Sequence, residues 1–265
     1  MMNARTELSP ASRVELHEEH DGRIARIVLA NAPDNAIDVT LANELCAALD
    51  AIERWPNLVC VLLEGEGTSF SSGLSLGHRR PPIGGELIRS FLAAAQKLST
   101  LEAVQMALVR GPCFGAGLDL ALLAHVVLAD STAKFGTADL SLAAIPLLTP
   151  LLLPERIGWT RAEEWMLSGR VIAVEEALAA GLVSGSSSGW ETLDTLAERY
   201  LRATVLFRPT TALRTFVHAL SLPRRERLEH DLPEIQRLFE ERIATSDNYA
   251  EGLSAALHGR PPCWK

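Results

Sequence analysis

The sequence Gly111-Pro-Cys-Phe-Gly-Ala-Gly-Leu-Asp-Leu120 leads from a short apolar strand into an apolar helix. A second segment, Phe70-Ser-Ser-Gly-Leu-Ser-Leu76, also follows directly after an apolar strand pattern. Small residues at both bends let backbone N–H groups approach a ligand closely. These two bends are therefore the first candidates for a binding site.

Backbone amides near the start of a helix stabilise anions, because the first-turn donors are unpaired and the helix dipole is positive there. Two such amides that face one oxygen atom form an oxyanion hole. Each bend also fits a purely structural role, since Gly-Ala-Gly before a helix commonly marks a tight turn or a close packing contact. Taken singly, the bends leave both interpretations open.

The strand pattern around the bends favours a layered α/β architecture. Short apolar strands are predicted at Leu58–Leu63, Val104–Val109 and His125–Ala129, with loops and helical segments between them. Strands of this kind, separated by helices, are typical of parallel pairing in βαβ-type units. Periodicity alone does not distinguish a doubly wound layer from a spiral.

The amino-terminal part predicts a hairpin followed by a helix. Apolar residues between Val14 and Leu29 flank the turn dipeptide Asp21-Gly22, which is typical of two paired strands. Apolar residues at helical spacing then predict a helix from Asp38 to about Trp55, with Asp38 as its N-cap.

Helices dominate from about Arg161 onward. The predicted helices are Arg161–Leu167, Val174–Ala180 with Gly181 as a C-cap, Glu191–Arg202, Thr210–Leu220 and Arg224–Ala244. Between them, Ser184–Gly189 predicts a surface loop. The apolar stripe of the last helix must cover either the protein's own sheet or a neighbouring subunit. This stripe consists of Ile235, Leu238, Phe239 and Ile243.

The composition predicts a globular protein with neither a nucleic-acid nor a membrane partner. The chain has 265 residues, of which 48% are hydrophobic, so it can bury a sizeable core. Its formal charge of -8 gives no support for the basic surface that nucleic-acid binding requires. The most apolar stretch, Leu140–Pro154, is too short to span a bilayer and predicts a buried loop and helix start. Four scattered cysteines and an N-terminus without an apolar signal segment predict a cytoplasmic location.

Other catalytic templates do not match this sequence. Gly65–Phe70 lacks the third glycine of a dinucleotide-binding fingerprint, and there is no GxxxxGK[ST] phosphate-binding loop. The zinc-binding pattern HExxH is also absent. The sequence therefore predicts no nicotinamide, nucleotide or metal cofactor.

Three blocks taken together resemble the signature of the enoyl-CoA hydratase (crotonase) superfamily. They are Phe70–Leu76, Arg110–Leu120 and Ala133–Asp139, and their mutual spacing fits as well. The resemblance implies an α/β fold, a crotonase-like spiral of ββα turns with a C-terminal helical region that builds trimers or hexamers. It divides the chain into a spiral core with the acyl-CoA site, residues 1–200, and a helical oligomerisation region, residues 201–265.

The resemblance also implies how the substrate is held. Leu74 and Ala116 would donate their N–H groups to the thioester oxygen of an acyl-CoA. The backbone around Asn35, Ala36, Ser72 and Leu76 would hold the coenzyme A portion. No cofactor beyond the CoA moiety of the substrate is implied, because the thioester is the electron sink and the amides act as the electrophile.

Hydratases of this superfamily have acidic residues, usually glutamate, at two positions. The resemblance places Asp119 and Asp139 at these positions. Two carboxylates can add water across an activated double bond, one deprotonating the water and the other exchanging a proton at the α carbon. Aspartate retracts each carboxylate by roughly one carbon–carbon bond, so the substrate must sit deeper, the backbone must shift, or the activity has changed. A double-bond isomerase and a catalytically silent acyl-CoA-binding scaffold are the alternatives.

The segment Leu142–Pro154 differs from straight-chain hydratases, which tend to have a glycine-rich helix start here. Its branched residues and prolines predict either an apolar wall for a cyclic acyl group or plain core packing. The carboxy-terminal segment Glu240–Leu253 is similar to that of the branch that hydrates cyclohexa-1,5-diene-1-carbonyl-CoA.

Overall fold

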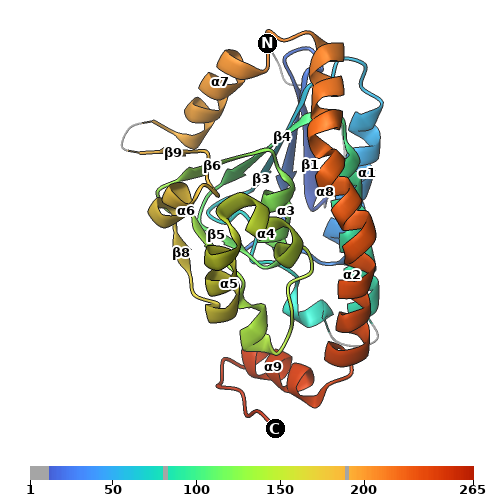
Figure 1. The fold of residues 1–265 in the computed structure, drawn as a ribbon, viewed down its shortest axis with the longest axis vertical. Coiled ribbons are helices and arrows are strands. Elements are labelled where there is room, and N and C mark those ends of the chain that lie inside the picture. The colour runs from blue at the N-terminus through green and yellow to red at the C-terminus, as the bar shows by residue number, and fades with distance from the viewer. Residues whose placement is uncertain (1–11, 80–82, 189–190) are drawn as a thin grey trace.

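The computed structural model describes residues 12–79, 83–188 and 191–265, and its centre is a six-stranded sheet (Figure 1). The strand order is β1 (Val14–Glu19), β2 (Ile24–Leu29), β3 (Cys60–Gly65), β4 (Val104–Val109), β6 (Val126–Asp130) and β9 (Gly185–Ser187). Within this sheet β1 pairs with β2 antiparallel, and each of the later neighbouring strands described pairs parallel. The predicted hairpin, α/β class and parallel pairing are confirmed.

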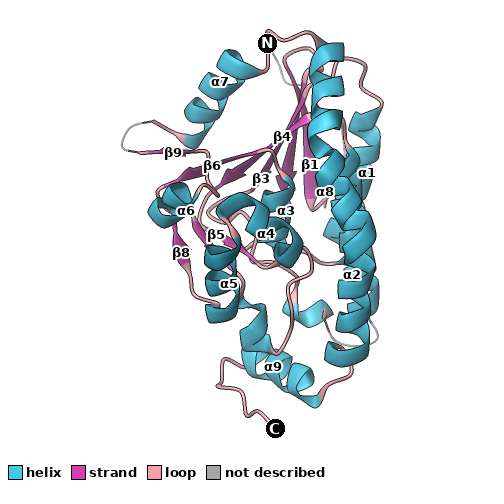
Figure 2. Cartoon of the chain, viewed as in Figure 1, coloured by secondary structure: helices cyan, strands magenta, loops and turns pink. Residues whose placement is uncertain are grey.

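The central strands β3 and β4 are predominantly apolar and buried along nearly their whole length, because both faces of the sheet are covered. On one face, alternate residues such as Leu63 and Val109 pack against α1 (Val39–Glu53), α2 (Ile83–Thr100) and α3 (Ala116–Leu123). On the other face, Leu62 and Leu108 belong to a second core together with α7 (Leu193–Thr204). Figure 2 shows this division, with α7 standing apart from the other helices.

A second, small sheet carries the bend Gly111–Leu120. It consists of β5 (Pro112–Phe114), β7 (Lys134–Gly136) and β8 (Ile172–Ala173). Isolated bridges join Ile37 to Leu74 and Ser71 to Cys113, so segments distant in sequence lie side by side. The chain thus repeatedly leaves the large sheet, crosses this second layer and enters a helix, which is how a spiral of ββα turns is built.

The remaining helical elements lie, apart from the short turn Leu76–His78, in the carboxy-terminal half. They are the 3₁₀ turns Leu76–His78 and Ala138–Leu142, α4 (Thr149–Ile157), α5 (Trp159–Ser168), α6 (Val174–Ala180), α8 (Thr210–Leu238), a π-helical turn Phe239–Ile243 and α9 (Asp247–Leu257). The predicted N-cap Asp38 accepts a hydrogen bond from Leu41 N, and Gly181 caps α6 in the left-handed conformation. Both predicted caps are confirmed.

Two predicted elements are wrong. The predicted surface loop Ser184–Gly189 contains β9, because Ser184 N donates to Val127 O and leads the chain onto the edge of β6. The predicted break between Thr210–Leu220 and Arg224–Ala244 is absent, and α8 continues through Pro223 and Pro233. A proline inside a helix removes one backbone hydrogen bond, but buried Val217 and Leu228 anchor α8 on either side of Pro223.

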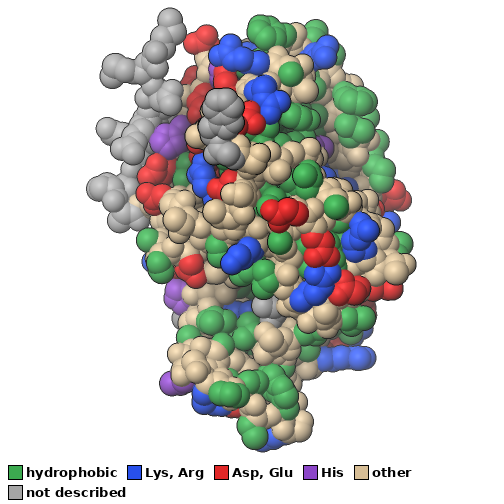
Figure 3. All heavy atoms as spheres, turned by 90° about the vertical axis from the view of Figure 1, so that its left-hand side faces the viewer, with side chains coloured by type: hydrophobic (Ala, Val, Ile, Leu, Met, Phe, Trp, Pro, Cys, Tyr) green, Lys and Arg blue, Asp and Glu red, His purple; other side chains and the backbone are tan. Residues whose placement is uncertain are grey.

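The long apolar segment Leu140–Pro154 is a loop followed by the start of α4, as predicted. Ala144, Leu147 and Leu148 are buried as expected, whereas Leu140 at its beginning is 45% exposed. Among the described residues, no helix is both long enough and apolar enough to cross a membrane. On the face drawn in Figure 3, Lys and Arg side chains are interspersed with Asp and Glu. The prediction that the N-terminus lacks a signal segment concerns residues that lie largely outside those described.

Candidate functional site

The two glycine-containing bends meet in space. Gly73 has a φ of +96°, and a Cβ built on it would lie 2.8 Å from Phe114 O and 3.3 Å from Ala116 N. Any side chain at Gly73 would therefore push the second bend away. Glycine is required here both for the backbone conformation and for the close approach of the two segments.

Two backbone amides at this contact have no acceptor within the described part of the chain. Leu74 lies in an isolated bridge in which the neighbouring groups, Gly73 O and Ser75 N, are both bonded to Ile37. Ala116 is the first residue of α3, and its N–H is one of the unpaired first-turn donors. The two predicted N–H donors are therefore available to a ligand oxygen, as the donors of an oxyanion hole must be.

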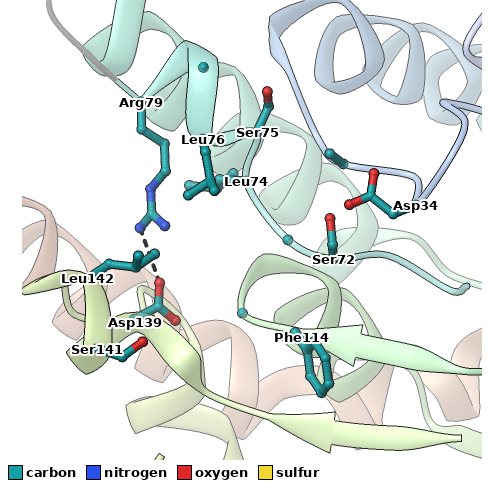
Figure 4. A pocket seen from close by; sticks show the side chains of 14 residues that line it. Asp34, Ser72, Leu74, Ser75, Leu76, Arg79, Phe114, Asp139, Ser141 and Leu142 are labelled. Carbon is teal, nitrogen blue, oxygen red and sulfur yellow. Dashed lines mark hydrogen bonds and ion pairs between the residues drawn. The ribbon is translucent and has the colours of Figure 1, made fainter. Parts of the chain in front are cut away.

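An open groove of about 430 Å³ runs past these amides (Figure 4). Its lining includes Ala36, Ser72 and Leu76, three of the four residues predicted to hold coenzyme A. Leu74 and Asp139 also line it, so the groove leads directly to the predicted reacting centre.

Asn35, the fourth predicted coenzyme A residue, lies behind the groove rather than in its lining. Its side chain is 1% exposed and donates to Glu66 O and Ser69 O, at 2.9 and 2.7 Å. Its own backbone O accepts from Ser71 Oγ at 2.8 Å. Asn35 thus fixes the loop that presents Ala36 and Ser72.

Asp119 is a buried carboxyl group on α3, three residues beyond Ala116, with only 1% of its surface exposed. Burial raises its pKa to about 7, and the nearby charge of Asp139 also raises it. Thr149 Oγ1 donates to Asp119 Oδ1 at 2.6 Å and, together with the Leu148 and Thr149 amides, opposes that rise. A carboxyl group with a pKa near 7 can both give and accept a proton at neutral pH.

Asp139 lies at the start of the 3₁₀ turn Ala138–Leu142 and is 8% exposed. Its Oδ1 accepts a hydrogen bond from Arg79 Nη2 at 3.1 Å, which Figure 4 marks with a dashed line. Its Oδ2 is buried and has no hydrogen-bond partner in the described part of the chain. One oxygen of this carboxylate is therefore held and the other is available.

A small inner cavity brings all four predicted reacting residues together. Its lining is Leu74, Arg79, Ala116, Asp119, Asp139, Ile145, Pro146, Leu147 and Phe239. The free space is about 10 Å³, roughly what one water molecule requires. An acyl group can enter only if this cavity opens.

Sequence analysis missed three residues of this site: Arg79, Thr149 and Phe239. Phe239 belongs to the predicted apolar stripe, which covers the inner cavity of its own chain. Arg79 and Thr149 gave no local signal, because their partners are 60 and 30 residues away in sequence. Among the described residues, no group of three or more His, Cys, Asp or Glu could hold a metal ion.

The sequence model of the family described as enoyl-CoA hydratase/isomerase matches residues 19–265. The chain is a member of the enoyl-CoA hydratase/isomerase family. Solved family structures share its fold. The enoyl-CoA hydratase from Bacillus halodurans superposes with a TM-score of 0.83 at 23% identity and covers 92% of this chain and 100% of its own. The enoyl-CoA hydratase/isomerase from Xanthobacter autotrophicus Py2 has a TM-score of 0.82 at 26% identity, covering 93% of each chain.

Two curated members of the enoyl-CoA hydratase/isomerase family illustrate its range. The cyclohexa-1,5-dienecarbonyl-CoA hydratase of Thauera aromatica is 28% identical over 255 residues, 96% of this chain and 98% of that protein. The 1,2-epoxyphenylacetyl-CoA isomerase of Escherichia coli K12 is 29% identical over 246 residues, 88% of this chain and 91% of that protein. The predicted crotonase-like fold and superfamily are confirmed, and the chain is an enzyme of this hydratase/isomerase family.

Proposed function

We propose that this enzyme adds water to an α,β-unsaturated acyl-CoA thioester. The oxygen of water bonds to the β carbon while a carboxylate takes one of its protons. The electrons of the double bond move toward the thioester oxygen, which the amides of Leu74 and Ala116 stabilise as an enolate. A carboxyl group then protonates the α carbon, so that Asp119 and Asp139 share the acid and base work.

The observation that carries this proposal is the shared inner cavity, in which two unpaired amides and two buried carboxyl groups surround one small space. An isolated carboxylate is expensive to bury, so two of them beside an anion-stabilising pair of amides are typical of proton-transfer sites. The groove lined by Ala36, Ser72 and Leu76 has room for the coenzyme A portion outside this cavity.

A cyclic dienoyl-CoA is the substrate class that we favour. Ile145, Pro146 and Leu147 form an apolar wall of the inner cavity, which suits a compact, non-linear acyl group. The relative from Thauera aromatica, a cyclohexa-1,5-dienecarbonyl-CoA hydratase, supports the same choice. The neighbouring residues Leu148, Leu152 and Leu153 are part of the hydrophobic core. The segment Leu142–Pro154 therefore contributes to core packing as well as to the wall of the cavity.

The direct test is turnover of two substrates by the purified protein. Cyclohexa-1,5-diene-1-carbonyl-CoA and crotonyl-CoA would be followed separately by the loss of absorbance of the conjugated enoyl thioester. We expect hydration of the cyclic substrate, and a large loss of rate in Asp119→Asn and Asp139→Asn. Failure of the wild-type protein to hydrate either substrate would refute the hydratase proposal.

A double-bond isomerase is the second candidate, favoured by the pKa of Asp119 near 7, which suits a group that moves one proton between two carbons. An isomerase needs only one carboxyl group, so it should tolerate one of the two variants Asp119→Ala and Asp139→Ala and lose activity in the other. A hydratase should lose activity in both variants. A silent acyl-CoA-binding scaffold would bind acyl-CoA tightly without turnover or solvent deuterium exchange at the α carbon.

The remaining proposals concern the surroundings of the reaction. The mechanism requires no cofactor beyond the CoA moiety, so activity should survive treatment with a metal chelator. We propose a cytoplasmic homotrimer or homohexamer, in which exposed apolar side chains such as Phe207 and Phe216 of the 201–265 region become covered. Light scattering coupled to gel filtration would measure the number of subunits.

A further inference from the structure

The helix α3 presents two groups of the site, the Ala116 amide at its N-terminus and the Asp119 carboxyl group one turn later. All eight of its residues are buried, and at 1.5 Å per residue it is about 12 Å long. Asp119 is its only polar side chain. Apolar packing is non-directional, so hydrogen bonds to the backbone at its two ends are needed to fix where α3 lies along its own axis.

Two arginines from other helices hold the C-terminal end of α3. Arg224 on α8 donates from Nη1 to Leu123 O, and Arg156 on α4 donates to three carbonyl oxygens, those of Leu122, Ala124 and His125. The last carbonyls of a helix have no partner within the helix. Here they belong to residues that are at most 2% exposed, so solvent cannot serve them. The two guanidinium groups take that role at the negative end of the helix dipole.

A buried hydrogen-bond network fixes the turn of α8 that carries Arg224. Gln105 N donates to His125 Nδ1 at 3.1 Å, so Nε2 carries the ring proton and donates to Ser221 Oγ at 3.3 Å. Burial, together with Arg224 and Arg156, lowers the pKa of His125 to about 4, which keeps the ring neutral. Burial and Arg156 lower the pKa of Arg224 to about 10, so this guanidinium is still charged at neutral pH. The turn is therefore fixed against β4 as well as against α3.

A displacement of α3 would reach the two amides of the site directly. A Cβ built on Gly117 would lie 2.7 Å from Ser71 O, so the first turn of α3 is in close contact with the bend that contains Leu74. From the other side, a Cβ built on Gly73 would lie 3.3 Å from Ala116 N. The distance between the Leu74 and Ala116 amides therefore depends on where α3 lies along its axis.

We propose that Arg224 is a positioning residue that, together with Arg156, holds α3 at its C-terminal end and so sets the distance between the two amides that bind the thioester oxygen. The inference rests on the proposed function, in which those amides stabilise the enolate. It adds a residue of the carboxy-terminal region to the support of that site. Arg224 acts only through the backbone of α3. Small displacements matter because each donor must lie about 2.7–3.1 Å from the oxygen.

Arg224→Met is the test variant, because it keeps an unbranched side chain and removes the donor to Leu123 O. We expect its kcat for hydration to fall at least about tenfold, since misplacing a reacting group by a fraction of an ångström has effects of this size. KM should stay within about threefold of wild type. Arg224→Lys, which keeps a charged donor, should restore part of the rate.

The matched control is Arg227→Met. Arg227 also lies on α8, but its guanidinium contacts Glu155 and Leu151 O on α4 rather than α3. This variant should keep the wild-type kcat. Arg224→Gln, which is polar and neutral, is a second test variant and should show the same loss as Arg224→Met. Circular dichroism would establish that each variant is folded.

A spectroscopic measurement separates positioning from a general loss of stability. Hydrogen bonds to a thioester oxygen lower the stretching frequency of its carbonyl group, so isotope-edited infrared spectra of bound butyryl-CoA, labelled with ¹³C at the carbonyl, report on the two amides. Butyryl-CoA is saturated and cannot be hydrated. We expect the band at low frequency in wild type and Arg227→Met, at higher frequency in Arg224→Met and Arg224→Gln, and between them in Arg224→Lys.

A wild-type kcat together with a wild-type carbonyl band, in either Arg224→Met or Arg224→Gln, would overturn the inference. An effect of equal size in Arg227→Met would overturn it as well, because that residue does not contact α3. Failure of the wild-type protein to hydrate any enoyl-CoA is a different result. It refutes the proposed function, whereas the infrared comparison still decides whether Arg224 positions the amides.

Discussion

Replacing Asp119 by asparagine is expected to stabilise the protein at neutral and alkaline pH while it removes activity. Burial raises the pKa of this carboxyl group from 3.8 to about 7, so its charged form is unfavourable in the folded chain. Asparagine resembles the protonated form and keeps an oxygen that can accept from Thr149 Oγ1. The substitution therefore removes a buried charge and preserves the local hydrogen bond.

The size and sign of the effect follow from proton linkage. Between pH 3.8 and about 7 the folded chain binds more protons at Asp119 than the unfolded chain does. The free energy of unfolding therefore falls as pH rises through this window, and the loss is complete above pH 7. The pKa difference of about 3 units corresponds to about 4 kcal/mol, because one unit is worth about 1.4 kcal/mol.

Urea unfolding of wild type and Asp119→Asn at a series of pH values from 4 to 9 measures this effect. Both proteins would be compared at one subunit concentration, since assembly adds to apparent stability. The advantage of the variant should grow by about 4 kcal/mol between pH 4 and pH 8. Glu163→Gln, at an exposed position on α5, is the matched control and should give a flat difference. A difference that stays constant or shrinks with pH would refute the reasoning.

Three further substitutions test the site. Gly73→Ala should weaken acyl-CoA binding at least about tenfold in calorimetry, because its Cβ would meet Phe114 O at 2.8 Å and displace the second bend. Thr149→Val removes a donor to Asp119 and should move the corresponding limb of the pH–rate profile upward by about one unit. Phe239→Ala should destabilise the protein by about 3 kcal/mol or more and raise the kcat/KM for bulkier cyclic acyl groups relative to crotonyl-CoA. Equal kcat/KM ratios for the two substrates in wild type and Phe239→Ala would argue against a restrictive inner cavity.

The parts of the fold that could be predicted from sequence are those with a local cause. The hairpin around Asp21-Gly22 and the cap at Gly181 depend on backbone conformations that few residue types adopt. The presence of Asp and Gly at these positions therefore predicts both features. The strand β9 carries no such signal, because Gly185–Ser187 has no apolar pattern and pairs only through its backbone with β6. Pro223 gave a false signal, since packing on both sides of it outweighs the lost hydrogen bond.

The same distinction applies to the site. The two bends could be predicted because their glycines and small residues are adjacent in sequence, and the structure brings Leu74, Ala116, Asp119 and Asp139 to one cavity. The partner of each carboxyl group could not be predicted in this way. Arg79 and Thr149 reach their acidic partners only through the folded arrangement of separate turns of the spiral.

The short side chains of Asp119 and Asp139 and the filled inner cavity fit together. Aspartate is one carbon–carbon bond shorter than glutamate and so leaves more space in front of its carboxyl group, yet the cavity holds only about 10 Å³. Other side chains occupy that space. The Thr149 hydroxyl donates a hydrogen bond to Asp119, the Arg79 guanidinium donates one to Asp139, and the Phe239 ring lines the cavity. Each aspartate is thus fixed by a neighbour that a longer side chain would displace. Phe239 lines the inner cavity, and Tyr249 of α9 packs edge to face on Phe239 and lies beside Arg79, so the carboxy-terminal helices contribute to the inner cavity as well as to the outer surface of the protein.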